Sequence, residues 1–361
     1  LIDANKCNDI RAAVSKAFER YKDIRDQPLS GKDVDLVHSA LMSQYNLFPV
    51  LWRKVEDWEL RIKRLTEEQQ KILKFLSKQK KAAIEGIAGS GKTILALAKA
   101  QSLAKQGYRT LLLCYNHMLK QWFERAMHED FNELVTIDTF HGLVNKISKK
   151  VFGELLTDKT KKLDDQFWLE EAPEKLMQAT DILDESEKFD AIVVDEGQDF
   201  NELWWASLQG MFNDPNNMEA YYVFFDPNQN IFNLEPTIPP DLPFYPLEDN
   251  CRNTVKIAEH CADIIGKKFG VIDSAPIGEK PKIIKLKSID EAFLKASEEI
   301  GNWCSFAKGG LNWKQVVMFA PYKCINKWPK KIKNIPVTKD FDSWRDGKGV
   351  LITTWGKFKG L

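Results

Sequence analysis

The sequence has few cysteines and histidines and lacks any long apolar run. Its six cysteines are scattered with no Cys-x-x-Cys pair, and its five histidines show no metal-ligand spacing, which argues against a disulfide framework and a zinc site. No run approaches the roughly 20 apolar residues of a membrane-spanning helix, and the N-terminus carries no signal-peptide pattern. These absences predict reduced thiols, a cytoplasmic location and no membrane partner.

An excess of either charge is also missing, because 52 lysines and arginines balance 52 aspartates and glutamates. The chain as a whole is therefore not a polycation. The charge is uneven along the sequence, however, with lysines concentrated at 71–81, 146–162 and 323–333 and acids at 181–202. Any one lysine run is more often a solvated helix face than a binding site, but a neutral protein can still carry a basic groove.

The pattern of apolar residues changes along the chain. Residues 1–63 show helical spacing and no strand candidate, whereas residues 64–250 alternate short β-rich runs with longer helical patterns. In the second region, strands are expected at 82–87, 110–115, 134–137, 191–194 and 221–225. Alternation of this kind predicts an α/β fold with a mainly parallel, doubly wound sheet, here with a helical insertion at about 145–187.

Residues 251–361 predict the beginning of a second α/β domain. Helices are expected at 254–265 and 289–303, and strands at 282–286, 316–319 and 350–353. The sequence therefore predicts three parts: a helical N-terminal segment at 1–63, an α/β domain at 64–250 and a partial second domain at 251–361.

An octapeptide at residues 86–93, GIAGSGKT, matches the phosphate-loop pattern G-x-x-x-x-G-K-[ST]. Glycines let the backbone turn tightly so that its N–H groups approach phosphate oxygens, the lysine reaches the β- and γ-phosphates, and the threonine hydroxyl ligates Mg²⁺. An ordinary glycine-rich turn is the alternative, but it does not account for the strand expected before the loop and the helix expected after it. The predicted ligands of a nucleotide and Mg²⁺ are Gly86, Gly89, Ser90, Gly91, Lys92 and Thr93.

A second informative stretch, IVVDEGQDF at 192–200, begins as a buried strand and ends in three carboxylates and an amide. Unpaired charges at the end of a buried strand cost several kcal/mol unless something compensates them. A phosphate-loop site requires such an acid, because a carboxylate at the end of a second strand holds Mg²⁺. Asp195 is the candidate for this role, and Glu196 is then placed to deprotonate an attacking water.

A phosphate loop does not by itself name a function. Further short motifs follow in order: LTEEQ at 65–69, LLCYN at 112–116, TIDTFHG at 136–142, DEGQD at 195–199, FDPNQ at 225–229, NCRN at 250–253 and TTWGKFKGL at 353–361. From about residue 65 to the end, this order resembles the UvrD-like group of superfamily 1 helicases, which are ATP-driven nucleic-acid motors built from two RecA-like P-loop domains. Within that group the chain is most similar to bacterial helicases fused to a nuclease-related domain.

The resemblance implies roles for individual residues. Gln69 would read adenine, Gln229 would sense the γ-phosphate, and Arg252 would reach ATP from the second domain. The expected catalytic residues are therefore Lys92, Asp195, Glu196, Gln229 and Arg252. The expected contacts with single-stranded nucleic acid are Tyr115, Asn116, Thr139, Phe140, His141 and Thr354.

Departures from the family pattern change some of these expectations. Cys251 stands where the family commonly has a tyrosine that stacks on the base, and Leu234 stands where relatives have a base-stacking tryptophan. Phe232, Tyr115 or Phe140 would then stack on a nucleic-acid base in place of that tryptophan, although each of these rings could equally belong to the core. The last arginine motif of the family is expected beyond Leu361.

Three functions remain open at this stage. The leading interpretation is a nucleic-acid-stimulated ATPase, using ATP and Mg²⁺ and acting as a helicase or translocase on single-stranded or partly duplex nucleic acid. The resemblance favours DNA over RNA and 3′→5′ movement, and it implies a nuclease-like domain upstream or a partner nuclease. The alternatives are a non-turnover nucleotide switch or nucleic-acid-binding scaffold serving such a nuclease, and a small-molecule kinase, in which Gln229 and the second domain would have no role.

Overall fold

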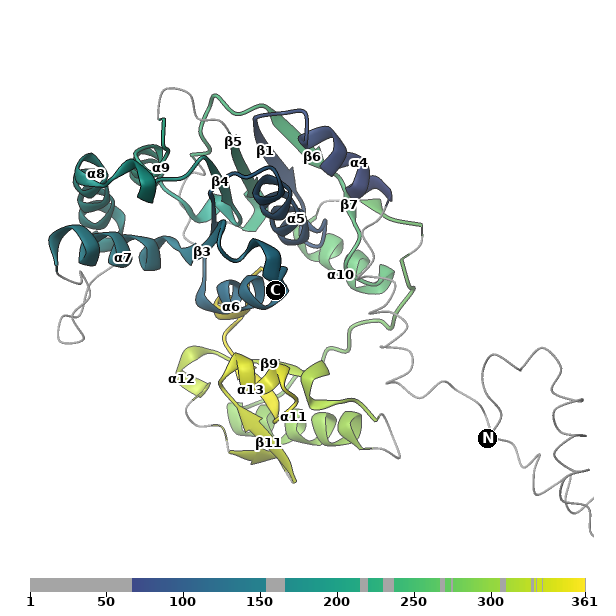
Figure 1. Ribbon diagram of the computed structural model, residues 1–361. Coiled ribbons are helices and arrows are strands. Elements are labelled where there is room, and N and C mark those ends of the chain that lie inside the picture. The colour runs from purple at the N-terminus through teal and green to yellow at the C-terminus, as the bar shows by residue number, and fades with distance from the viewer. Residues whose placement is uncertain are drawn as a thin grey trace, which may run out of the picture. The chain divides into compact units, whose positions relative to one another are not determined.

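A computed structural model describes residues 67–153, 166–214, 220–229, 237–266, 270–273, 275–305, 310–325, 328, 330–332 and 334–360. All of these belong to the second of the two units into which the chain divides, Val50–Leu361 (Figure 1). The helical segment expected at 1–63 and the stacking candidate Phe232 lie outside the described residues.

The larger sheet is parallel throughout and has six strands in the order β3-β2-β4-β5-β1-β6. Its strands are β1 (Lys81–Gly86), β2 (Thr110–Cys114), β3 (Val135–Thr139), β4 (Ala191–Val194), β5 (Ala220–Phe225) and β6 (Phe244–Leu247). The first five were predicted, and β6 was not. Pro246 lies in β6, where a missing backbone donor is tolerated because β6 is an edge strand.

Helices cover both faces of this sheet. They are α4 (Glu67–Leu76), α5 (Lys92–Lys105), α6 (His117–Ala126), α7 (Phe140–Phe152), α8 (Ala172–Ile182) and α9 (Glu202–Gln209), and α10 (Val255–Ile265) follows after the last strand of the sheet. Side chains alternate along β4, so that Ile192 and Val194 pack in the core beneath α7, α8 and α9, whereas Ala191 and Val193 pack in the core beneath α5 (Figure 1). The predicted RecA-like α/β fold with a doubly wound parallel sheet is confirmed.

None of the helices within the described ranges is both long and apolar enough to cross a membrane.

A smaller sheet follows, with the order β10-β11-β12-β9. Its elements are α11 (Ile289–Cys304), β9 (Val317–Phe319), α12 (Tyr322–Ile325), β10 (Lys331–Ile332), β11 (Ile335–Thr338), α13 (Phe341–Arg345), β12 (Val350–Thr353) and α14 (Trp355–Phe358). Strands β11, β12 and β9 are parallel, and β10 pairs antiparallel with β11. In the sequence between the strands of the two sheets, β7 (Asp249–Asn250) pairs with β8 (Gly270–Val271).

The strand predicted at 282–286 is wrong, because these residues have no regular structure. A strand needs a neighbour for its backbone hydrogen bonds, and no described strand lies beside this segment. Its apolar side chains are correspondingly exposed, Ile283 at 73% and Ile284 at 40%. Apolar spacing alone therefore misled the assignment.

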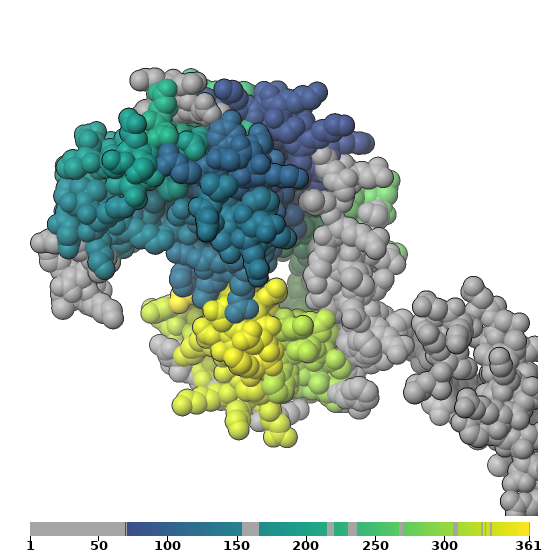
Figure 2. Space-filling model, viewed as in Figure 1, coloured from purple at the N-terminus to yellow at the C-terminus, as the bar shows by residue number. Residues whose placement is uncertain are grey.

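Helix α6 joins the two sheets. Its Met118 is buried with Phe341, Trp344 and Leu351 of the smaller sheet, and its Trp122 packs against the same cluster. In Figure 2 the blue region that contains α6 touches the yellow C-terminal residues. An element that begins at the end of β2 is thus in direct contact with α13 and β12.

Helix α5 contains a buried lysine, Lys99, which is only 2% exposed. Its ammonium donates a hydrogen bond of 2.9 Å to the Leu76 carbonyl and lies 4.2 Å from the centroid of the Tyr222 ring. Burial lowers the pKa of Lys99 from 10.5 to about 8.

We therefore predict a specific pH dependence for Lys99→Met. Between pH 8 and 10.5 the unfolded chain binds more protons at Lys99 than the folded chain does, so this group makes the free energy of unfolding rise with pH. The variant lacks that rise, and wild type should gain stability relative to it from pH 7 to pH 10. Urea unfolding at several pH values measures the difference, with exposed Lys314→Met as control. A difference that stays constant with pH would contradict the prediction.

Candidate nucleotide site and adjoining pocket

The phosphate loop connects β1 to α5. Gly89 and Gly91 have φ values of +81° and +88°, a backbone region that other residues rarely adopt. Lys92, 6% exposed, points back into the loop, and its ammonium donates to the carbonyl oxygens of Gly86 at 2.7 Å and Ile87 at 3.0 Å. These contacts give the loop a preformed shape with its lysine held at the centre.

The acidic motif follows β4 in the same sheet. Asp195 is completely buried, and its pKa is raised to about 7 by burial and by neighbouring Glu196, against the opposing effects of Thr93 and Lys92. Glu196 has φ 60° and ψ 40°, and it is the only non-glycine residue with positive φ in the described part of the chain. This left-handed conformation costs about 1–2 kcal/mol, and such strain is found mainly at functional sites.

A chain of hydrogen bonds joins the ends of β4 and β5. The Gln198 amide donates to Glu196 Oε2, and its carbonyl oxygen accepts from the backbone N–H of Asp226 at 2.9 Å. Asp226 Oδ2 in turn accepts from the Gln229 amide at 2.8 Å and lies 3.7 Å from the Lys92 ammonium. The two predicted motifs DEGQD and FDPNQ are therefore one connected unit beside the phosphate loop.

The segment that contains Arg252 lies directly on the phosphate loop. The backbone N–H groups of Cys251 and Arg252 both donate to the Gly89 carbonyl, at 2.9 and 3.0 Å, and the Asn250 amide donates to the Ala88 carbonyl at 3.0 Å. Burial lowers the pKa of Arg252, whereas Cys251 and the Asp195 carboxylate raise it. The backbone of the predicted arginine therefore lies on the phosphate loop, and Asp195 favours its charged form.

A cavity of about 230 Å³ lies beside this segment. Gln69 lines it and donates from its amide to the Ser90 carbonyl at 3.1 Å and to Cys251 Sγ at 2.8 Å. Its remaining wall is largely aliphatic and acidic, formed by Ile72, Pro246, Leu247, Glu248, Asp249 and Ile272. The residue predicted to read a base and the residue that replaces the stacking tyrosine thus share one cavity.

Thr93 and Asp195 meet the requirements of a Mg²⁺ site. Thr93 lies near Asp195 and helps to lower the pKa of its carboxyl, and Asp195 Oδ2 is buried without a hydrogen-bond partner. Among the described residues, no group of three or more His, Cys, Asp or Glu side chains is arranged to hold a metal ion. One carboxylate and one hydroxyl nevertheless fit Mg²⁺, which usually completes its octahedron with water and substrate phosphates.

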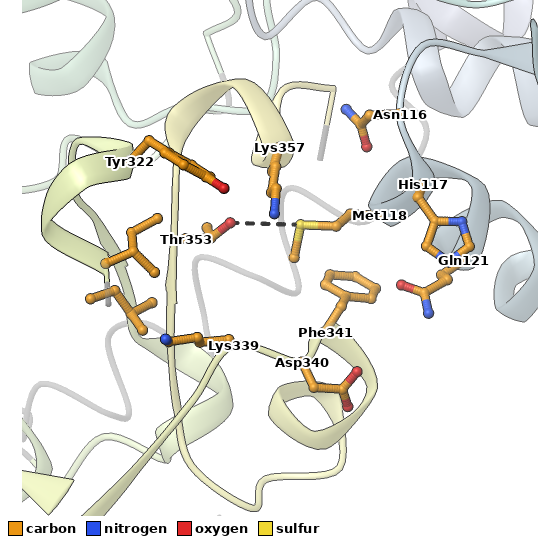
Figure 3. Close-up of a pocket in the computed structure, with 12 residues that line it drawn as sticks. Asn116, His117, Met118, Gln121, Tyr322, Lys339, Asp340, Phe341, Thr353 and Lys357 are labelled. Atoms are coloured by element: carbon orange, nitrogen blue, oxygen red, sulfur yellow. Dashed lines mark hydrogen bonds between the residues drawn. The ribbon is translucent and has the colours of Figure 1, made fainter. Parts of the chain in front are cut away.

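A second and larger cavity, of about 540 Å³, lies between α6 and the smaller sheet (Figure 3). Figure 3 shows Tyr322, Lys357 and Phe341 around the contact between Thr353 and Met118, whose hydroxyl and sulfur are 3.9 Å apart. The other lining residues are Asn116, His117, Gln121, Ile325, Lys339, Asp340 and Ile352. The sequence had indicated only Asn116 among these, because the rest lie outside its motifs or were given no role.

Three predicted nucleic-acid contacts are helix caps. The side chain of Asn116 accepts from Leu119 N–H at the start of α6, Thr139 caps α7, and Thr354 caps α14. These bonds satisfy backbone donors that a helix start leaves open. Tyr115, half-buried, lies with its ring centroid 5.7 Å from the Lys359 ammonium.

Two other candidates, Phe140 and His141, lie among aromatic side chains. Phe140 is 2% exposed and stacks on Trp204 with a centroid separation of 3.9 Å. His141 lies 4.1 Å from the Trp168 ring, and burial lowers its pKa to about 4. As it lies here, the Phe140 ring is not available for stacking on a base, which favours the core alternative for Phe140.

Sequence reasoning missed Lys359, although it lies in the quoted motif TTWGKFKGL. Its ammonium donates to Asp199 Oδ2 at 2.6 Å and to the Gln229 carbonyl at 2.9 Å, and it lies 3.5 Å from Glu196 Oε2. The signal that could have indicated it is the charge balance, since the buried acids of the motif DEGQD require a cation.

Comparison with known proteins gives a family match and two distant structural likenesses. Residues 50–218, just under half of the chain, match the family described as type III restriction enzyme, res subunit. No curated protein matches the chain. One matching structure, of two coordinating Pif1 helicases unwinding forked double-stranded DNA, has 14% identity, a TM-score of 0.29 and coverage of 73% of this chain and 56% of that one. Another, Bacteroides Pif1 bound to single-stranded DNA, has 14% identity, a TM-score of 0.26 and coverage of 72% and 51%. The chain spans about half the length of these solved chains.

Proposed function

We propose that the chain is a nucleic-acid-stimulated ATPase that acts as a superfamily 1 helicase or translocase. The observation that carries the proposal is that the backbone of the Arg252 segment lies on the phosphate loop, whose Lys92 contacts the ends of the neighbouring strands, next to a cavity lined by Gln69. The match of residues 50–218 supports a nucleic-acid-directed ATPase. The UvrD-like subgroup, the preference for DNA and a nuclease partner are finer parts of the same proposal.

In this proposal the ATP phosphates lie along the loop of residues 86–93. The backbone N–H groups at the start of α5 and the Lys92 ammonium face the β- and γ-phosphates, with Lys92 exchanging its contacts to Gly86 and Ile87 for phosphate oxygens. Asp195 and Thr93 would hold Mg²⁺, which neutralises charge on the β- and γ-phosphate oxygens when bound.

Hydrolysis requires a base and groups that receive the developing negative charge. Glu196 takes a proton from the attacking water, and the hydrogen bond from Gln198 orients its carboxylate. Gln229 and Arg252 contact the γ-phosphate, where an arginine can contribute 10³–10⁵ in rate. The backbone N–H of Arg252 donates to the Gly89 carbonyl, so the side chain starts beside the loop that would hold the phosphates.

The nucleic-acid strand is assigned to the 540 Å³ cavity beside α6. Lys339 and Lys357 supply cations for phosphates, and Tyr322, 72% exposed, offers a ring for stacking on a base. Asn116 lines the same cavity and comes from one of the motifs that the sequence linked to nucleic acid. A scaffold without turnover is the second candidate, and ATP hydrolysis by the wild type in the presence of single-stranded DNA separates the two.

The first prediction from this proposal concerns Glu196→Gln. Glutamine keeps the size and one acceptor oxygen but cannot take a proton, so ATP binding should change little while hydrolysis falls roughly 10²–10⁴-fold. The matched variant Lys92→Ala should lose ATP affinity itself, because it removes the cation that faces the phosphates. Titration of a fluorescent ATP analogue and phosphate release with single-stranded DNA measure both properties. Hydrolysis by Glu196→Gln at nearly the wild-type rate would show that Glu196 is not the base, whereas absence of hydrolysis in the wild type would favour the scaffold.

The second prediction concerns Cys251→Tyr. The cavity beside Gln69 has a volume of about 230 Å³, and a ring at position 251 can stack on adenine, which strengthens binding by about 1 kcal/mol, or roughly fivefold. Cys251→Ser is the control, because its hydroxyl can keep a hydrogen bond to Gln69 without adding a ring. The same fluorescent titration measures affinity. Equal or weaker binding by a folded tyrosine variant would show that position 251 does not face the base.

The third prediction concerns the strand cavity. Lys339→Ala should weaken binding of single-stranded DNA about equally for all sequences and reduce the salt slope by about 1, because it removes one phosphate contact. Tyr322→Ala should cost about 1–3 kcal/mol of stacking with an unchanged salt slope. Fluorescence anisotropy at several salt concentrations measures both. Exposed Lys314→Ala serves as the control. If Lys314→Ala and Lys339→Ala weakened binding of single-stranded DNA equally, the cavity would not be part of the DNA-binding surface.

A further inference from the structure

The residues after α14 enter the catalytic site although they belong to the smaller sheet. Lys359 is 9% exposed, and its ammonium contacts Asp199, Glu196 and the Gln229 carbonyl. Glu196 is 3% and Asp199 4% exposed, so water screens little of their charge. Lys359 is the cation that pairs with both carboxylates, and removing a cation from buried acids is strongly unfavourable, so Lys359 constrains where both can lie.

The backbone of the same segment makes two further contacts. The Lys359 carbonyl accepts a hydrogen bond of 2.8 Å from the Asn116 amide, and the Gly360 carbonyl accepts one of 3.2 Å from the Thr93 hydroxyl. Gly360 has φ +89°, and a Cβ there would lie 2.7 Å from Leu119 Cδ2 and 3.3 Å from Glu196 Oε1. The close approach of this segment to the catalytic residues therefore depends on a glycine.

These contacts join two places that the proposed function treats as separate. Asn116 and Lys357 line the strand cavity, whereas Thr93 and Glu196 belong to the nucleotide site. Only Phe358 separates Lys357 from Lys359 in the sequence. A phosphate that draws Lys357 or Asn116 toward the cavity consequently displaces the segment that holds Glu196.

We infer that Lys359 is a positioning residue through which an occupied strand cavity changes the placement of Glu196 and so controls hydrolysis. The inference rests on the proposed function and adds a structural route by which bound nucleic acid would stimulate ATP hydrolysis. Lys359 does not touch the strand in this route, and it acts on the reaction only through the Glu196 carboxylate. A purely structural role is the alternative, in which Lys359 only neutralises buried acids and its loss affects folding and all activities alike.

The test compares Lys359→Met, Lys359→Arg and the matched surface variant Lys348→Met in the 361-residue chain. Lys348 is exposed and pairs only with Asp346 among the ion pairs of the described residues. Phosphate release is measured with and without single-stranded DNA, together with affinity for a fluorescent ATP analogue and thermal unfolding. For Lys359→Met we expect at least a tenfold loss of the ratio of stimulated to basal rate, with analogue affinity within about threefold of wild type. Lys359→Arg should recover part of the ratio, because arginine can also pair with Asp199.

Lys359→Met combined with Asp199→Asn keeps the test decisive if the single variant is unstable. This double variant removes the buried acid along with its cation, so it should fold while still lacking the stimulation. A folded variant, single or double, whose stimulation ratio equals that of wild type would overturn the role of Lys359 and leave the proposed ATPase intact. Absence of any stimulation in wild type would contradict both.

Discussion

Burial of negative charge is the constraint on which the site depends. Asp195, Glu196 and Asp199 are each at most 4% exposed and follow one short strand. Such a cluster is tolerable only where cations and hydrogen-bond donors surround it. The cations come from distant parts of the chain, Lys92 from the phosphate loop and Lys359 from the residues after α14. Neutralising these acids therefore ties remote segments of the chain to the end of β4.

The parallel sheet makes this convergence possible. Its order places β5 between β1 and β4. The phosphate loop, the acidic motif and the FDPNQ motif therefore all follow the carboxyl ends of neighbouring parallel strands. Gln198 and Asp226 connect neighbouring strand ends at 2.9 Å, and Lys92 and Asp226 connect across to the loop. These links are buried, where a polar group left without its partner is costly, so they hold the three strand ends together.

Much of this arrangement could be predicted from the sequence because strand and loop signals are local. The glycines, Lys92 and Asp195 follow β-rich runs whose order specifies a parallel sheet, and the fold was confirmed in these elements. The prediction at 282–286 failed because strand formation depends on a neighbour that apolar spacing does not reveal. Phe140 had two equal interpretations because local sequence cannot separate a core ring from a stacking ring. The role of Lys359 was missed because its partners lie 130–160 residues away in sequence.

The central claim is that the nucleotide site and the strand cavity form one coupled device. The most direct measurement is the affinity of the chain for labelled single-stranded DNA with and without a non-hydrolysable ATP analogue, paired with the analogue's affinity with and without DNA. If the sites are coupled, each ligand must change the affinity of the other by the same factor. We expect that factor to be about 5–150, the usual range for coupled sites. A factor of one in both titrations would contradict the account.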